Sequence, residues 1–400
     1  MDFSISKEQR ELLDRLDEFC EANLDEWSIQ EWLSDGVVSD AFMLKYSEAG
    51  FGPIGYPERM GGIPSTVLTR TLILERLAYH AAATLPMQGS FLSAQIVSHL
   101  ANDRQMDIFQ RYLHKTGKLS FSFAVSEPTS GSNTLDTQTV AVEDEDGDGF
   151  VIDGVKTFVN FGQYAPYIVL LAYDDALGVD PQTGHKQLSF FLVPRDAPGV
   201  DVIPVSKIGQ LLIPSAEIVL NDVRVGKEAV IGPRGVAASV VLDFFEYGRL
   251  YLCATSVGMA QAALRQAVKF ALHRSLSGTS IMSYQQIQEM LVDMQIKVDS
   301  MRCMLYRCAC EFDVGGENTR LDTALLKRYV PRTAMEVADA AMQVMGSTGY
   351  LSTTRAARVW QECRGNRLAE GTDQVMTVIA AKRIARAVEE DKDFMSSWWL

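Results

Sequence analysis

The sequence has few basic residues for its length. Its 400 residues include 37 lysines and arginines against 51 acidic residues, which gives a formal net charge of −14. A protein that binds nucleic acid needs a basic surplus to neutralise phosphates, and this chain has none. We therefore exclude nucleic acid as a partner.

Long apolar runs and targeting signals are also missing. The apolar run at 167–172 is far too short to cross a bilayer. The first residues show neither the basic and apolar regions of a secretory signal nor the Arg-rich and Ser-rich pattern of a transit peptide. We expect a cytoplasmic protein without a membrane span.

Cysteine is scarce and is not arranged for metal binding. The six cysteines are scattered, mostly within helix-like patterns that are typical of small buried residues in a reducing compartment. Cys308 and Cys310 have no second pair of ligands at metal spacing. We expect no metal site.

Apolar residues are plentiful, at 47%, and suffice for two or three domains. Their spacing is helical from residue 7 to about 113, strand-like from about 119 to 226, and helical again beyond Gly235. Long helices are expected at 240–270, 283–312, 321–345 and 373–389, and hairpin turns at 147–149 and 152–154.

This order predicts an α+β protein of three domains. They are an N-terminal α-helical domain (1–118), a central β-barrel-like or sandwich domain (119–228) and a C-terminal four-helix bundle (229–400).

Glu370 is the strongest candidate for a catalytic group. It opens the run Glu370-Gly371-Thr372, between a basic, loop-like stretch at 364–369 and a predicted helix. A carboxylate on such a turn can reach into a cavity and act as a base. Taken alone, the run is more typical of an ordinary helix start, where acidic residues are common.

Two segments of the β domain could hold a flat polar ring. Residues 126–133 leave a strand through proline and glycine and expose hydroxyls and backbone amides. Phe158 and Asn160 are two residues apart and share one side of a strand, so one could stack on a ring while the other bonds its edge. The plain alternatives are a surface turn and a core phenylalanine.

Three helical motifs are ambiguous by themselves. Glu246 and Arg249 are one turn apart, a spacing that usually gives a solvated ion pair. Arg274 stands at a break between helices, where a guanidinium could hold a pyrophosphate. The run 343–349 ends a helix with glycines, either as a cap or where the backbone meets a ligand closely.

In this order and at these separations, the segments resemble the acyl-CoA dehydrogenase family over essentially the whole chain. The matching segments are 57–62, 126–132, 156–158, 220–225, 246–249, 257–261, Arg274 with Gly278 and Gln285, 343–349 and 370–372. The resemblance implies FAD, bound between the β domain and the C-terminal bundle of a homotetramer.

The resemblance also implies a reaction. Glu370 would abstract the α-proton of an acyl thioester, either acyl-CoA or an acyl-carrier-protein thioester. The β-hydrogen would leave as hydride to N5 of FAD, giving the trans-2-enoyl thioester. Electrons would then pass to an electron-transfer flavoprotein or another acceptor.

Further residues acquire roles from the resemblance. Those that match cofactor contacts are Phe123, Ser126, Phe158, Asn160, Arg274, Gln343, Ser347, Thr372 and Gln374. Those that match the acyl thioester site are Ser132, Glu246, Arg249 and Gly371. Arg274 would reach the FAD of a neighbouring subunit.

The chain departs from the family pattern at several positions. Asn160 stands where threonine or serine is usual, which is expected to alter the flavin potential. Ala369 replaces a frequent tyrosine and suggests room for a branched, aromatic or otherwise unusual acyl group. Ser277 and Ser347 also differ from the usual residues, and these changes put the cofactor contacts between subunits in doubt.

Two other functions remain open. The same residues could run the reverse reaction and reduce an enoyl thioester. Alternatively, the fold could serve as a flavin-free, non-catalytic binding protein. The aromatic tail at 394–400 is expected to pack at a subunit interface, because exposed adjacent tryptophans favour aggregation.

Overall fold

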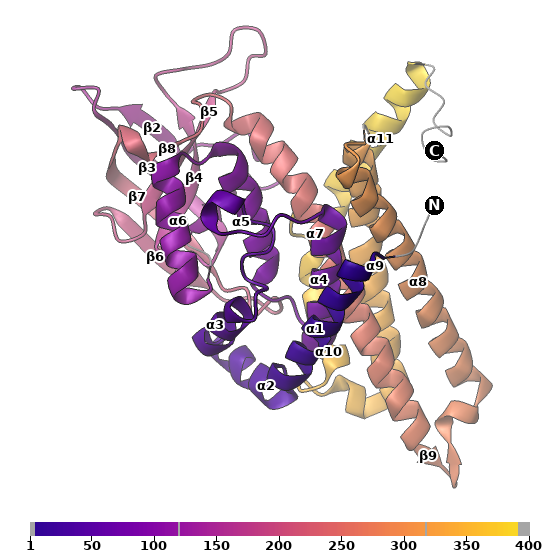
Figure 1. The fold of residues 1–400 in the computed structure, drawn as a ribbon. Coiled ribbons are helices and arrows are strands. Elements are labelled where there is room, and N and C mark those ends of the chain that lie inside the picture. The colour runs from indigo at the N-terminus through magenta and orange to yellow at the C-terminus, as the bar shows by residue number, and fades with distance from the viewer. Residues whose placement is uncertain (1–4, 119–120, 317, 391–400) are drawn as a thin grey trace. The chain divides into compact units, whose positions relative to one another are not determined.

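The computed structural model describes residues 5–118, 121–316 and 318–390, which form two compact units. Among the described residues, the sheet unit comprises those within 27–65 and 85–245, and the helical unit comprises those within 5–26, 66–84 and 246–390. Along the chain, helices precede the sheet and helices follow it (Figure 1). The predicted α+β class, with its order of helical, sheet and helical regions, is confirmed.

The N-terminal helices are shared between the two units. The helical unit contains α1 (Lys7–Asn23) and α4 (Val67–Ala81). The sheet unit contains α3 (Asp40–Glu48), α5 (Met87–Leu100) and α6 (Asp103–Thr116), while α2 (Glu26–Asp35) begins at the division. The three-domain division stays a prediction, and its boundary at residue 119 lies outside the described residues. The aromatic tail at 394–400, predicted to pack at an interface, also lies outside them.

The sheet unit is built on eight strands in the order β6-β7-β3-β2-β4-β5-β8, with β1 paired parallel to β4. The strands are β1 (Phe121–Ala124), β2 (Val140–Glu143), β3 (Gly149–Asn160), β4 (Tyr167–Asp174), β5 (Leu188–Pro194), β6 (Val200–Val205), β7 (Ser215–Gly226) and β8 (Val230–Ile231). Their inward side chains, among them Ile152, Ile168 and Phe191, form one buried core.

Strand β3 has two irregularities in its pairing with β7. One lies between Ile152 and Gly154, so the predicted hairpin turn at 152–154 is wrong, although a turn does lie between β2 and β3 near 147–149. Gly154 has a φ of +154°, and a side chain there would collide with Thr139. A glycine within a strand pattern marks a bulge as readily as a turn.

The second irregularity of β3, between Lys156 and Val159, contains Phe158 in a left-handed conformation with a φ of +52°. Such a conformation is a genuine outlier for a bulky residue. The bulge therefore needs support from its surroundings, and Lys156 lies directly before it.

Lys156 anchors this bulge from within the core. Its side chain is fully buried, and its Nζ atom is 2.8 Å from Glu127 Oε1 and donates to the carbonyl of Val125 over 3.1 Å. Glu127 also accepts from the backbone N–H of Thr139. Burial opposes the charge on Glu127, but Lys156 and hydrogen bonds from the hydroxyls of Thr137 and Thr139 outweigh it and lower the pKa of Glu127 to about 2.

Replacing Lys156 with methionine should lower the free energy of unfolding by about 3–5 kcal/mol, because Glu127 would remain buried without its cation. Lys227→Met is the matched control, since Lys227 is exposed and lies 3.9 Å from Asp148. It should cost less than about 1 kcal/mol. Urea unfolding of the two variants measures both values, and equal losses would contradict the assignment.

The helical unit is dominated by four long helices near their predicted positions. They are α7 (Ala237–His273), of which residues 246–273 belong to this unit, α8 (Gln285–Asp313), α9 (Thr319–Met345) and α11 (Asp373–Glu389). Helix α9 packs against α8, α11 and the shorter α10 (Arg355–Asn366), and Figure 1 shows α8 and α9 running alongside each other.

In the described part of the chain, no helix is both long and apolar enough to span a membrane.

The predicted loop at 364–369 is partly wrong, because Arg364, Gly365 and Asn366 form the last turn of α10. Asn366 is buried, and its Nδ2 atom donates to Ser256 Oγ over 2.9 Å. A polar composition suggested a loop, but this contact keeps the polar turn helical. The true turn is short and begins at Arg367.

Candidate active site

The turn between α10 and α11 displays Glu370 in an unusual backbone conformation. Glu370 has a φ of +56° and Gly371 follows with a φ of +97°. Thr372 then caps α11, its hydroxyl accepting from the N–H of Val375 over 3.3 Å. A left-handed glutamate costs free energy and persists only where the surroundings hold it.

Two buried cations hold this turn. Arg249 of α7 donates from Nε to the carbonyl of Glu370 over 3.1 Å, and Lys327 of α9 donates from Nζ to the carbonyl of Gly371 over 2.9 Å. Arg249 is 6% exposed and Lys327 is fully buried. Successive carbonyls of the strained turn therefore each receive a charged donor.

The carboxylate of Glu370 packs over Gly248. A Cβ atom at position 248 would lie 2.6 Å from Glu370 Oε2, so a side chain there would displace the carboxylate. The residue as a whole retains some exposure, yet Oε2 is buried and has no hydrogen-bond partner among the described residues. A buried oxygen of this kind calls for an explanation, and a ligand group is the simplest one.

The pKa of Glu370 lies near neutral pH. Burial raises the pKa of Glu370 to about 7, against the lowering influence of Arg249 and Lys327. Burial likewise lowers the pKa of Lys327 to about 8. A carboxylate with a pKa near 7 can take up a proton and release it again at physiological pH.

Glu246 and Arg249 do not form the solvated pair that their spacing alone suggests, since both are 6% exposed. Glu246 accepts from Arg320 Nε over 2.5 Å and from Thr319 Oγ1 over 3.2 Å. The structure thus brings Glu370, Gly371 and Arg249 into direct contact, with Glu246 on the same helix as Arg249. The sequence reasoning missed Lys327, although its place directly after the apolar residues 324–326 was a signal.

In the sheet unit, the structure gathers Ser126, Phe158 and Asn160. The N–H of Thr157 donates to the carbonyl of Ser126 over 2.9 Å, which joins the loop to β3. Phe158 stands on its bulge with 62% of its surface exposed, so the plain interpretation as a core residue is wrong. An exposed aromatic ring held in a strained conformation is typical of a binding surface.

The amide of Asn160 is oriented by residues that the sequence did not reveal. Its Oδ1 atom accepts from Ser215 Oγ over 2.8 Å, and Lys207 Nζ donates to Ser215 Oγ over 2.9 Å. Because Oδ1 is engaged, the Nδ2 group is the part of the amide that presents N–H donors. Asn160 is exposed, so these donors can reach a ligand.

The other predicted residues lie outside these two clusters. Phe123 is half-buried on β1, with its ring centroid 4.4 Å from that of Phe244 and 5.6 Å from that of Phe190. The remaining candidates are exposed on loops, helix ends and the first turn of α11. These are Ser132, Arg274, Gln343, Ser347 and Gln374. Their exposure leaves them available for contacts beyond their own unit.

The residues of the sheet unit fit a flavin. Phe158 offers an exposed ring for stacking on a flat heterocycle, and Asn160 offers amide donors for its polar edge. The nearby carbonyl of Ser126 is already engaged by Thr157, so its hydroxyl is the group that can turn to a ligand. FAD is thus compatible with the residues present.

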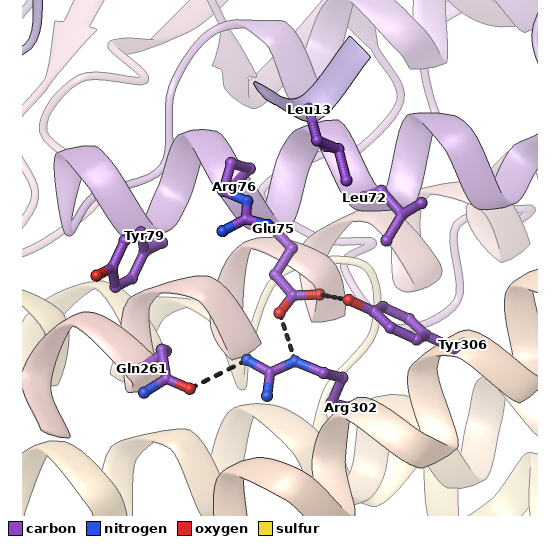
Figure 2. A pocket seen from close by; sticks show the side chains of 8 residues that line it. All are labelled: Leu13, Leu72, Glu75, Arg76, Tyr79, Gln261, Arg302 and Tyr306. Carbon is purple, nitrogen blue, oxygen red and sulfur yellow. Dashed lines mark hydrogen bonds and ion pairs between the residues drawn. The ribbon is translucent and has the colours of Figure 1, made fainter. Parts of the chain in front are cut away.

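A separate cavity of about 330 Å³ lies within the helical unit (Figure 2). At its edge, Glu75 accepts from Arg302 Nε over 2.7 Å and from the hydroxyl of Tyr306 over 2.6 Å, while Arg302 also donates to Gln261 over 3.2 Å. These polar groups satisfy one another, and none of the lining residues belongs to the 370–372 turn. We assign the network a structural role in joining α4, α7 and α8.

Comparisons with known proteins match nearly the full chain. The family models "Acyl-CoA dehydrogenase, N-terminal domain", "middle domain" and "C-terminal domain" match residues 6–116, 122–223 and 238–385. The probable acyl-CoA dehydrogenase YdiO of Escherichia coli K12 is 32% identical over 387 residues, covering 96% of this chain and 99% of that protein.

Solved structures agree with the family models. An acyl-CoA dehydrogenase from Slackia heliotrinireducens has a TM-score of 0.85 at 34% identity and covers 98% of this chain and 99% of its own. Butyryl-CoA dehydrogenase from Megasphaera elsdenii has a TM-score of 0.85 at 25% identity, covering 96% of this chain and 100% of its own.

Replacing Glu370 with glutamine should stabilise the protein at pH 8. The pKa of Glu370 in the folded protein, about 7, is above the ordinary 4.5, so its contribution to stability is present below pH 4.5 and lost as the pH rises through 7. The variant escapes that loss and should gain about 2 kcal/mol at pH 8 and little at pH 5.

Urea unfolding at the two pH values measures this difference. The exposed residue Glu389 on α11 provides the control variant Glu389→Gln, which should show no comparable gain. A gain for Glu370→Gln that is the same at pH 5 and pH 8 would show that the carboxylate is not buried as described.

Proposed function

Because this chain belongs to the acyl-CoA dehydrogenase family, we propose that it oxidises the Cα–Cβ bond of an acyl thioester with Glu370 as the base. Family membership makes it an FAD-dependent oxidoreductase that acts on acyl-CoA. The observation that carries the finer proposal is the buried Oε2 atom of Glu370, which lacks a partner among the described residues.

The α C–H of a thioester is a weak acid, so proton removal needs an aimed base and donors for the charge that grows on the carbonyl oxygen. Glu370 is held as that base by the carbonyl bonds from Arg249 and Lys327, and its own backbone N–H is the proposed donor. When bound, FAD supplies the acceptor for the β-hydrogen, which leaves as hydride. The product is the trans-2-enoyl thioester.

The flavin contacts are proposed in two groups. In the sheet unit, Phe158 stacks, and Asn160 and Ser126 donate, with Phe123 behind them. In the helical unit, the proposed contacts are Arg274, Gln343, Ser347, Thr372 and Gln374. Ser132, Glu246, Arg249 and Gly371 are proposed to line the acyl thioester site, although Arg249 now also has the role of holding the turn.

The substrate carrier, the electron acceptor and the oligomeric state are also proposals. The acyl group is carried by CoA or by a carrier protein, and an electron-transfer flavoprotein or another acceptor takes the electrons. A homotetramer is supported by exposed apolar side chains of the helical unit, such as Val292 and Ile296, one turn apart on α8, and Val388 on α11.

One observation favours the reverse reaction as a second candidate. A hydroxyl can both donate and accept, whereas the Nδ2 group of Asn160 can only donate. A donor favours a flavin edge that accepts, as in the oxidised ring, over one that carries a proton. Asn160 should thus lower the reduction potential of the flavin. A lower potential makes the reduced cofactor a better hydride donor to an enoyl thioester.

Glu370→Gln should leave a yellow flavoprotein whose flavin is no longer bleached by an acyl thioester, with the bleaching rate falling at least about 100-fold. Stopped-flow absorbance with a panel of acyl-CoA and acyl-carrier thioesters measures the rate, and Glu389→Gln is the control. Undiminished bleaching would remove Glu370 as the base. A colourless wild-type protein would instead favour the non-catalytic alternative.

Asn160→Thr should raise the midpoint potential of the bound flavin. If one hydrogen bond of about 1 kcal/mol to the reduced ring is gained, the rise is about 20 mV for two electrons. Spectroelectrochemical titration measures the potential. Asn221→Thr, at an exposed position on β7, is the control, and a shift of equal size there would refute the role of residue 160.

A further inference from the structure

Lys327 is a buried cation on a helix face that is otherwise lined by small and apolar side chains. It lies on the buried face of α9 together with Ala324, Val330 and Ala334, and its side chain has no exposed surface. Burying an ammonium group is costly unless it is paired and hydrogen-bonded. Its one hydrogen bond among the described residues is to the carbonyl of Gly371, directly after Glu370.

We propose that Lys327 is a positioning residue for Glu370, which fixes the left-handed 370–371 turn and supplies positive charge that allows the buried carboxylate to ionise. The inference rests on the proposed role of Glu370 as the base. It assigns Lys327 no contact with substrate or cofactor.

The titratable and charged groups that act on Glu370 or on its two cations come from several elements. Helix α7 contributes Glu246, Arg249 and Cys253, and helix α9 contributes Arg320 and Lys327. Asp373 on α11 acts on Lys327 and pairs with Arg367, which follows α10.

Most of these charges balance in pairs. Glu246 is matched by Arg320 at 2.5 Å, and Asp373 by Arg367 at 2.6 Å. Within the set, the cations that bond the turn itself are Arg249 and Lys327. Two cations therefore act on a single carboxylate.

The two cations are not equivalent. Arginine stays charged at every accessible pH, whereas burial lowers the pKa of Lys327 to about 8. The charge of Lys327 is thus present near pH 7, where Glu370 titrates, and is lost not far above. Replacing this charge should change the ionisation of Glu370 even though Arg249 remains.

The test compares three variants of Lys327 in the holoenzyme. Lys327→Met removes the charge and the hydrogen bond, Lys327→Gln removes the charge and keeps a donor for Gly371, and Lys327→Arg keeps both. The rate of flavin bleaching by an acyl thioester is measured from pH 6 to pH 9. In the wild type this rate should rise with pH as Glu370 loses its proton.

In the Met and Gln variants, the rise should move to higher pH by about one unit, because a nearby cation no longer favours the carboxylate. Lys327→Arg should keep the wild-type profile. Arg328→Met is the matched control, since it removes the same charge from the next residue of α9, where the guanidinium bonds Thr377 over 3.2 Å. Its profile should also be unchanged.

A second readout needs no turnover. Urea unfolding at a series of pH values gives the pH range over which the protein loses stability as Glu370 ionises. In Lys327→Gln this range should move to higher pH, as the bleaching profile does. If Lys327→Met fails to fold, the Gln and Arg variants still decide the question.

Unmoved profiles in the charge-free variants would overturn the inference. A uniform fall in rate at every pH would do so as well, because it would indicate a structural role alone. Failure of the proposed function has a different signature, namely persistent bleaching in Glu370→Gln whatever the Lys327 variants do.

Discussion

The structure of the candidate site depends on one constraint, the left-handed turn at Glu370 and Gly371. The chain does not adopt this conformation readily, so the turn is maintained by charged donors at two successive carbonyls, from Arg249 and Lys327. The same two cations limit the cost of ionising the carboxylate. The two cations therefore hold the turn that carries Glu370 and, acting against burial, help to set the pKa of its carboxyl group.

The sheet unit uses a similar arrangement. Phe158 also occupies a left-handed conformation, on a bulge that directly follows the buried Lys156. Lys156 bonds Glu127, which in turn fixes the loop that holds Ser126. In both units a buried lysine stabilises the backbone beside a strained residue, so stability of the core and geometry of the site come from the same interactions.

Much of this could be predicted from the sequence. The helical and alternating periods of the apolar residues were sufficient for the helix, sheet, helix order, because burial of one face imposes them. Glycine and polar residues were less informative. Gly154 lies at a bulge and Asn366 lies at the end of a helix, although both positions were predicted as turns or loops. The composition of a turn, a bulge and a helix end can be the same. The distant residues that pack against these positions, Thr139 and Ser256, distinguish them.

The sequence by itself determined the class of fold, through the order and spacing of its motifs, and it singled out Glu370 as the proposed base. Only the tertiary structure decided the state of that carboxylate. The pKa of Glu370 depends on its burial and on charges brought from far along the chain, since Arg249 is 121 residues from Glu370 and Lys327 is 44 residues from Gly371. Desolvation and Coulomb interactions depend on distance in space, which local sequence patterns do not contain.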